Sequence, residues 1–238
     1  MSLYEVHRDD LNRPWMVCEG AKIRILHDER EKFKPPSRDE AVHVSSKMSE
    51  WTVEDAPSGY ERLIEKLNYQ APAHLLRMLR PRLPPAQNIL DIGAGTGFLG
   101  APLIEEGHTL DGLDFSRVML SKAKERGYRQ TFCASAEQLD MRDIIPSSFS
   151  YDVLISCGLY GDFVHPSWIT HTLGVLRRDR ESYVAIAGRS ENLDNLDMYL
   201  ENEGFRILAW DENIGHITSQ GFEIPYVYLI SIVAGGNR

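Results

Sequence analysis

The sequence predicts an α/β domain built on a mostly parallel sheet of seven strands, with helices on both faces. Two observations lead to this prediction. After Pro84-Pro85, short apolar segments alternate with amphipathic ones, in the order strand and then helix. Several of the strand segments are continuous apolar runs, which is typical of parallel strands buried on both faces. Ligands of such sheets bind at the carboxyl ends of the strands, where the strand order reverses.

The expected elements follow from hydrophobic period and punctuation. The predicted strands are 88–92, 109–114, 130–134, 151–156, 183–187, 205–210 and 226–233. The predicted helices between them are 97–106, 117–126, 166–176 and one that begins after Asn192. Ser116 is expected to cap its helix at the N-terminus, and Gly107, Gly127 and Gly204 are expected to end helices.

A separate extension precedes this alternating region. Residues 1 to about 50 are polar and weakly periodic, apart from a short alternating segment at 22–26. Helices are then predicted over 60–68 and from Pro72 to about Pro81. We therefore expect an N-terminal helical extension, or lid, over 1–84 and a ligand-binding domain over 85–238.

Composition limits the partners. The 26 basic and 35 acidic residues give a net charge of −9, which argues against an obligatory nucleic-acid partner, because phosphate contacts dominate that affinity. The longest apolar run, 226–234, is too short to cross a bilayer, and the first residues lack the apolar core of a secretion signal. Three widely spaced cysteines predict neither disulfides nor a metal site. We expect a cytoplasmic protein without a membrane partner.

The segment most informative about function is the turn after the first predicted strand, NILDIGAGTGFLG at 88–100. Its glycines at 93, 95 and 97 allow a sharp turn that can bring backbone N–H groups against a ligand. Asp114 ends the next strand, 21 positions after Gly93, where a carboxylate can accept hydrogen bonds from both ribose hydroxyls of an adenosine. The pattern predicts a nucleotide-type site.

A dinucleotide cofactor is an alternative, because Gly95 to Gly100 also matches G-x-G-x-x-G. Two features argue against it. Asp91 lies two residues before the first glycine, where it would repel a pyrophosphate but would suit a ligand that carries an ammonium group. About 85 residues precede the turn, whereas dinucleotide-binding folds typically begin with it.

These residues resemble motif I of the class I S-adenosylmethionine-dependent methyltransferases, hydrophobic-Asp-hydrophobic-Gly-x-Gly-x-Gly. The resemblance covers about 89–233. Residues 111–120 resemble the second motif, with Asp114 in the ribose-binding position, while 133–139 resemble the adenine-flanking third motif and 150–156 the fourth strand. It implies a Rossmann-like fold with S-adenosylmethionine as cofactor.

A narrower similarity is to the methyltransferase-like proteins of the Williams–Beuren syndrome region. It rests on 67–72, on Gly127-Tyr128 and on 158–166. Two departures from the broader family pattern are present: Ser135 stands where the third motif usually has Asp, and Arg177 to Arg180 replace a Lys-Pro-Gly-Gly turn. The first departure predicts a weaker contact with the adenine amino group, or one made through the backbone.

The resemblance and the residue pattern together give a set of expected cofactor-binding residues. These are Asp91, Gly93, Ala94, Gly95, Gly97, Asp114, Phe115, Ser116, Ser135, Ala136, Glu137 and Cys157. Some have local alternatives: Asp114 could cap the following helix, Phe115 could be a core aromatic, and Ser135 with Gln138 also fits a capping box.

Methyl transfer from a sulfonium requires mainly that the reacting atoms be held in line, and a general base only if the acceptor loses its proton early. Candidate bases follow the fourth strand, at Tyr160, Asp162 and His165, while Trp51, Tyr60 and Tyr69 are candidate lid aromatics. The motifs of exocyclic-amine, cytosine-carbon and arginine methylators are missing, which leaves a small molecule or a protein side chain as acceptor. The alternatives are a catalytically silent S-adenosylmethionine-binding regulatory protein and an NAD(P)-dependent oxidoreductase.

Overall fold

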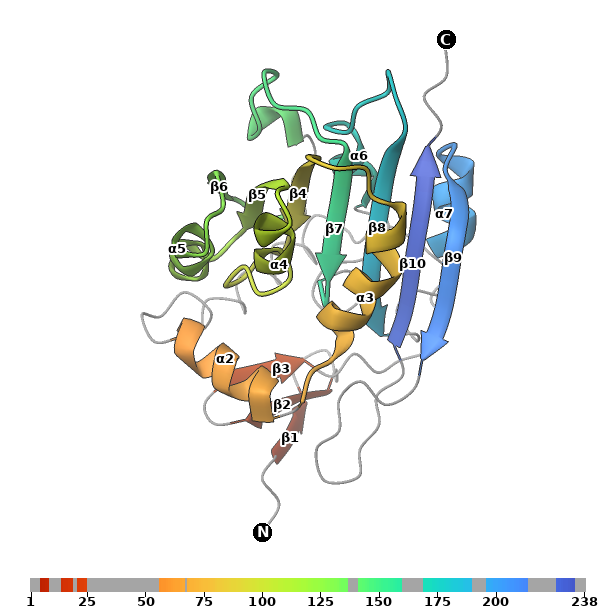
Figure 1. Ribbon diagram of the computed structural model, residues 1–238. Coiled ribbons are helices and arrows are strands. Elements are labelled where there is room, and N and C mark those ends of the chain that lie inside the picture. Colours follow the sequence, from red (N-terminus) through yellow and green to blue (C-terminus); the bar gives the residue numbers. More distant parts are fainter. Residues whose placement is uncertain are drawn as a thin grey trace.

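A seven-stranded sheet forms the centre of the protein (Figure 1). Across the sheet the strands are β6 (Gln130–Cys133), β5 (Thr109–Asp114), β4 (Asn88–Ile92), β7 (Val153–Cys157), β8 (Ser182–Arg189), β10 (Tyr226–Val233) and β9 (Arg206–Asn213). The first five are parallel, and β10 is antiparallel to both of its neighbours. The predicted seven-stranded, mostly parallel sheet is confirmed.

The computed structural model describes only part of the chain, and the account below refers to that part. The described residues are 5–8, 14–18, 21–24, 56–66, 68–136, 141–159, 169–189, 196–213 and 226–233.

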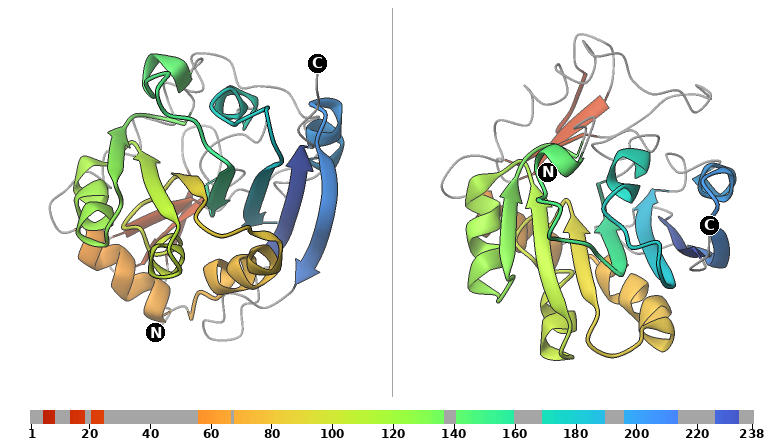
Figure 2. Two further views of the ribbon diagram at one scale, coloured as in Figure 1. Left: turned by 45° about the horizontal axis from the view of Figure 1, so that its top comes forward. Right: turned by 90° about the horizontal axis from the view of Figure 1, so that it is seen from above.

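Helices cover both faces of the sheet (Figure 2). One face carries α3 (Ala71–Leu79), α4 (Ala101–Glu105) and α5 (Arg117–Glu125), and the other carries α6 (Ile169–Leu173) and α7 (Leu196–Asn202). Short 3-10 turns, η2 (Arg80–Arg82) and η3 (Met141–Asp143), lie between elements. Each face has its own hydrophobic cluster, because successive strand side chains point to opposite sides: Ile89 belongs to one cluster, and Leu90 and Ile92 to the other.

Most predicted boundaries hold to within a few residues. Ser116 caps α5 as predicted, since its hydroxyl accepts a hydrogen bond from the Met119 N–H at 3.3 Å. The helix predicted from Gly97 begins only at Ala101, because Gly97 has a φ of +80° and belongs to a turn closed on the Ala94 carbonyl. The first residues of the helix predicted over 166–176 lie outside the described part.

The N-terminal region contains three short strands in addition to the predicted helices. The strands β1 (Glu5–Arg8), β2 (Pro14–Cys18) and β3 (Ala21–Arg24) form a small antiparallel sheet, of which only β3 overlaps a predicted segment. Strands of four or five residues are too short for a clear alternation, so their pairing is not visible in the sequence. The predicted helix over 60–68 is α2 (Ala56–Lys66), which starts four residues earlier because Pro57 is accommodated in a first helical turn.

The order in which the chain adds strands to the sheet reverses between β4 and β7. The chain passes from β4 to β5 and β6 on one side, and then to β7 and β8 on the other. The carboxyl ends of these strands share one edge, which faces α2 and the small N-terminal sheet (Figure 1). Such a switch point is where open α/β sheets bind ligands. None of the described helices is long and apolar enough to cross a membrane.

Candidate active site

The turn after β4 needs its glycines for two reasons. Gly93, Gly95 and Gly97 have φ values of +74°, +52° and +80°, a region that L side chains rarely adopt. A Cβ on Gly97 would also lie 2.8 Å from the Tyr128 ring and 2.9 Å from the Cα of Ala123. The turn therefore approaches α5 too closely for any side chain at this position.

The backbone N–H groups of the turn are bonded inside the protein. Those of Gly93 and Ala94 both donate to the Leu113 carbonyl, at 2.8 and 3.0 Å, and that of Gly97 donates to the Ala94 carbonyl at 2.8 Å. The N–H of Gly95 donates to Asp114 Oδ2 at 2.9 Å. The end of β5 and the turn itself thus supply acceptors for these four N–H groups. These four donors are therefore engaged within the protein.

Asp114 lies at the end of β5, directly beside this turn. Its side chain is 8% exposed; Oδ2 accepts from Gly95, and Oδ1 accepts from the Ser116 N–H at 2.8 Å. Burial raises the pKa of Asp114 to about 6, although the backbone hydrogen bonds act in the opposite direction. A carboxylate offers about four acceptor positions, so both oxygens can still accept hydroxyl protons from a ribose.

Asp91 is the second carboxylate of the site. It is 1% exposed, and the Tyr128 hydroxyl donates to its Oδ2 at 2.6 Å. Burial raises the pKa of Asp91 to about 7; the Tyr128 hydrogen bond lowers it, and the negative charge of Asp114 raises it further. Two carboxylates at the ends of adjacent strands make this edge negative, which fits a ligand with positive charge better than a phosphate.

Aromatic side chains from α2 and the following segment lie at the same edge. Burial raises the pKa of Tyr60, and the charges of Cys157, Asp114 and Asp91 raise it further. The Tyr60 hydroxyl therefore lies within electrostatic reach of the ends of β7, β5 and β4. The Tyr69 hydroxyl lies 3.3 Å from Cys157 Sγ. Two of the three expected lid aromatics are therefore close to the predicted site, and the third, Trp51, lies outside the described residues.

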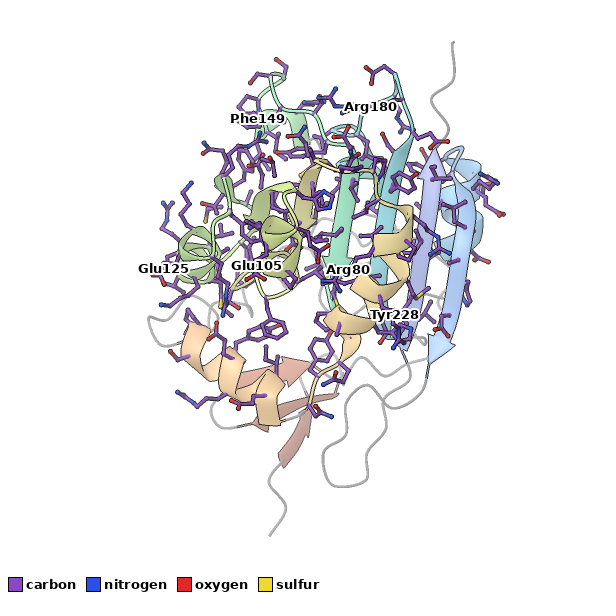
Figure 3. All side chains as sticks on the ribbon, viewed as in Figure 1. Arg80, Glu105, Glu125, Phe149, Arg180 and Tyr228 are labelled. Carbon is purple, nitrogen blue, oxygen red and sulfur yellow. The ribbon has the colours of Figure 1, made fainter. Side chains whose placement is uncertain are left out.

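A buried polar cluster lies beside Cys157 under α3, near the labelled Tyr228 in Figure 3. His74 is 4.2 Å from the Tyr228 ring, and its Nε2 lies 2.7 Å from Asp211 Oδ2. Arg77 donates to His74 Nδ1 at 2.6 Å, so that Nε2 carries the proton donated to Asp211. The charges of Cys157 and Asp211, together with burial, raise the pKa of Tyr228. These contacts join α3 to β9 and β10.

The remaining predicted residues divide into those at the site and those outside the described part. Phe115 is half-buried and its carbonyl accepts from Cys133 Sγ at 3.4 Å, while Ser116 is buried and caps α5. Ser135 and Ala136 follow β6 at the same edge. Glu137, Tyr160, Asp162 and His165 lie outside the described residues.

Sequence reasoning overlooked Tyr128 and Arg126 as functional residues. Tyr128 was noted only as part of the Gly127-Tyr128 pair, yet its hydroxyl bonds Asp91 from 37 positions away. Arg126 follows α5, where cations are common, and its hydrogen bond to the Thr96 carbonyl, 30 positions away, has no sequence signal. Among the described residues, no three His, Cys, Asp or Glu side chains gather in a way that could hold a metal ion.

Comparisons with known proteins show what this region of the chain is similar to. Residues 89–179 match the family described as "Methyltransferase domain". The 18S rRNA (guanine-N(7))-methyltransferase RID2 of Arabidopsis thaliana is 32% identical over 115 residues, which is 48% of this chain and 31% of that protein. The chain therefore matches less than a third of this relative's length.

Solved structures share the fold. Magnesium protoporphyrin IX methyltransferase (ChlM) from Synechocystis PCC 6803, crystallised with bound SAM, has a TM-score of 0.58 and 13% identity, covering 84% of this chain and 100% of that one. A TehB-like SAM-dependent methyltransferase from Corynebacterium glutamicum has a TM-score of 0.53 and 18% identity, covering 75% and 99%. The solved structures therefore share the Rossmann-like fold, and residues 89–179 match a methyltransferase domain family.

Proposed function

We propose that this protein transfers a methyl group from S-adenosylmethionine to a neutral or cationic acceptor, either a small molecule or a protein side chain. One observation supports this above the others: Asp91 and Asp114 lie at adjacent strand ends beside a glycine turn whose N–H groups at 93, 94, 95 and 97 are bonded internally. Such a site has acceptors for a ribose and a partner for an ammonium group, whereas a pyrophosphate would meet two carboxylates at this edge. This argues against the NAD(P) alternative.

The proposed roles follow from position. S-adenosylmethionine supplies a methyl group already activated on a sulfonium. Asp114 accepts the ribose hydroxyl protons, and Asp91 faces the ammonium group. Phe115, Ser135, Ala136 and Glu137 flank the adenine. Gly93, Ala94, Gly95 and Gly97 shape the turn, Ser116 supports Asp114 through its N–H, and Cys157 borders the methyl side at the end of β7. In this arrangement the protein acts mainly by holding the reacting atoms in line.

The acceptor side is rich in phenol groups and poor in available positive charge among the described residues. Tyr69 contacts Cys157, and Tyr60 and Tyr228 lie within electrostatic reach of it. The nearby cationic side chain, Arg77, donates to His74, which in turn bonds Asp211. Aromatic walls suit planar or cationic acceptors, which supports the proposed neutral or cationic class. Tyr160, Asp162 and His165 remain the proposed bases if the acceptor must lose a proton.

A nucleobase in RNA is a second candidate acceptor. The similarity to the 18S rRNA (guanine-N(7))-methyltransferase supports it, whereas the net charge of −9 argues against extensive phosphate contacts. We also propose the narrower similarity to the Williams–Beuren region methyltransferase-like proteins, which rests on the sequence at 67–72, on Gly127-Tyr128 and on 158–166. The cysteine usage supports a cytoplasmic location, and we propose no obligatory nucleic-acid partner.

Ligand-induced stabilisation and product formation together test the proposal. Unfolding temperature is measured with S-adenosylmethionine, S-adenosylhomocysteine and NAD(P); a millimolar ligand with micromolar affinity stabilises the folded state by about 4 kcal/mol. Release of S-adenosylhomocysteine is then measured with pools of small amines and phenols, with peptides and with RNA. Stabilisation by NAD(P) alone would overturn the proposal. Binding without turnover on any pool would favour the silent regulatory protein, and turnover on RNA alone would favour the second candidate.

A further inference from the structure

Arg126 connects the lid helix to the glycine turn. Its Nη1 donates to the Thr96 carbonyl at 2.6 Å and lies 2.9 Å from Glu61 Oε1 of α2. Arg126 is 31% exposed and Glu61 is 37% exposed, so the pair is only partly screened by water. Helices α2 and α5 pack against each other around this contact (Figure 1). One guanidinium nitrogen thus contacts both the lid and the cofactor turn.

Tyr60 is the residue that the contact would control. It precedes Glu61 in α2, and consecutive helical residues point about 100° apart. Burial raises the pKa of Tyr60, and the charges of Cys157, Asp114, Asp91 and Glu61 raise it further, so its hydroxyl lies near these groups. Because Tyr60 and Glu61 are adjacent in α2, a contact that fixes the rotation of this helix through Glu61 also fixes where the Tyr60 side chain lies.

We propose that Glu61 and Arg126 are positioning residues, which hold α2 against the glycine turn so that Tyr60 covers the cofactor site. The inference rests on the proposed function, because it assumes that S-adenosylmethionine binds at Asp91 and Asp114. It adds a prediction that the function alone does not make: an ion pair outside the pocket sets the affinity for the cofactor.

The test is a double-mutant cycle with S-adenosylhomocysteine as the probe, measured by titration calorimetry on the full chain. Glu61→Gln breaks the lid contact while Arg126 can still bond Thr96, and Arg126→Gln removes both contacts. We expect Glu61→Gln to weaken binding about two- to five-fold, the range that partly exposed ion pairs typically contribute. The double variant should bind no more weakly than Arg126→Gln alone.

Two further measurements separate positioning from a general loss of stability. The matched control is the Arg80–Glu106 ion pair, at 2.6 Å with exposures of 42% and 38%, which is distant from the site; Glu106→Gln should leave the affinity unchanged. In a Tyr60→Ala background, Glu61→Gln should have no additional effect, because the contact acts through Tyr60.

The outcomes are distinguishable. Wild-type protein that binds no probe would refute the proposed function itself. Wild-type binding with an unchanged affinity in Glu61→Gln, or an equal loss in Glu106→Gln, would refute the positioning role and leave the function intact. If Glu61→Gln weakened probe binding as much in the Tyr60→Ala background as in the wild type, the positioning role would also be refuted.

Discussion

Replacing Tyr128 with phenylalanine tests whether Asp91 binds the ammonium group of the cofactor. The substitution removes one hydroxyl, which donates to Asp91 Oδ2 at 2.6 Å in a site where both residues are 1% exposed. A hydrogen bond to a charged group is worth about 1.5–3 kcal/mol, and one pKa unit corresponds to about 1.4 kcal/mol. We therefore expect the pKa of Asp91 to rise from about 7 by roughly one to two units.

The direction of the effect follows from which form binds. An ammonium group pairs with the ionised carboxylate, so affinity increases as pH rises through the pKa of Asp91 and is lost as pH falls. In Tyr128→Phe, the pH range over which the affinity is lost lies at higher pH. At pH 7 the ionised fraction falls from about one half to about one tenth or one hundredth, which weakens binding about 5- to 50-fold.

The assay is the dissociation constant for S-adenosylhomocysteine, measured by calorimetry between pH 6 and 8.5. The matched control is Tyr151→Phe, because the Tyr151 hydroxyl donates at 2.9 Å to Asp111, another fully buried carboxylate, near the opposite edge of the sheet. That variant should lose stability without moving the pH midpoint of binding. Coincident pH profiles for Tyr128→Phe and the wild type would refute the role given to Asp91.

Three further results are expected. Asp114→Ala should weaken cofactor binding about 10- to 100-fold with the domain still folded, because it removes charged acceptors for the ribose; unchanged affinity by calorimetry would refute the motif assignment. Gly97→Ala should lower the free energy of unfolding by about 1–3 kcal/mol more than Gly107→Ala does. Both glycines have a positive φ, but of the two only Gly97 has atoms close to where a Cβ would lie. Equal losses of unfolding free energy in urea melts would contradict this. Deleting residues 1–50 should leave cofactor affinity within about a few-fold, because the proposed cofactor ligands Asp91 and Asp114 lie outside that segment, while turnover of the acceptor falls sharply. Joint loss of affinity and turnover would place the segment in the core.

Local pattern was sufficient for much of the fold. The strands at 88–92, 109–114 and 226–233 have the predicted bounds, and turn residues follow the first two closely. The glycine turn and the carboxylate that ends the next strand were also visible, since both belong to one short βαβ unit. Helix starts were less accurate, because a turn rich in glycine and a helical first turn look alike until the hydrogen bonds are known.

The amino-acid sequence by itself determined an alternating α/β domain with a nucleotide-type turn. It also predicted Asp91 and Asp114 as candidate cofactor-binding residues. Tertiary structure decided that β10 runs antiparallel, that the turn's N–H groups close on Leu113 and Asp114, and that Tyr128 bonds Asp91. The contact of His74 with Asp211 joins residues 137 positions apart. Such partners depend on how helices pack on strands, and neither periodicity nor motif spacing carries that information, because both describe only neighbours along the chain.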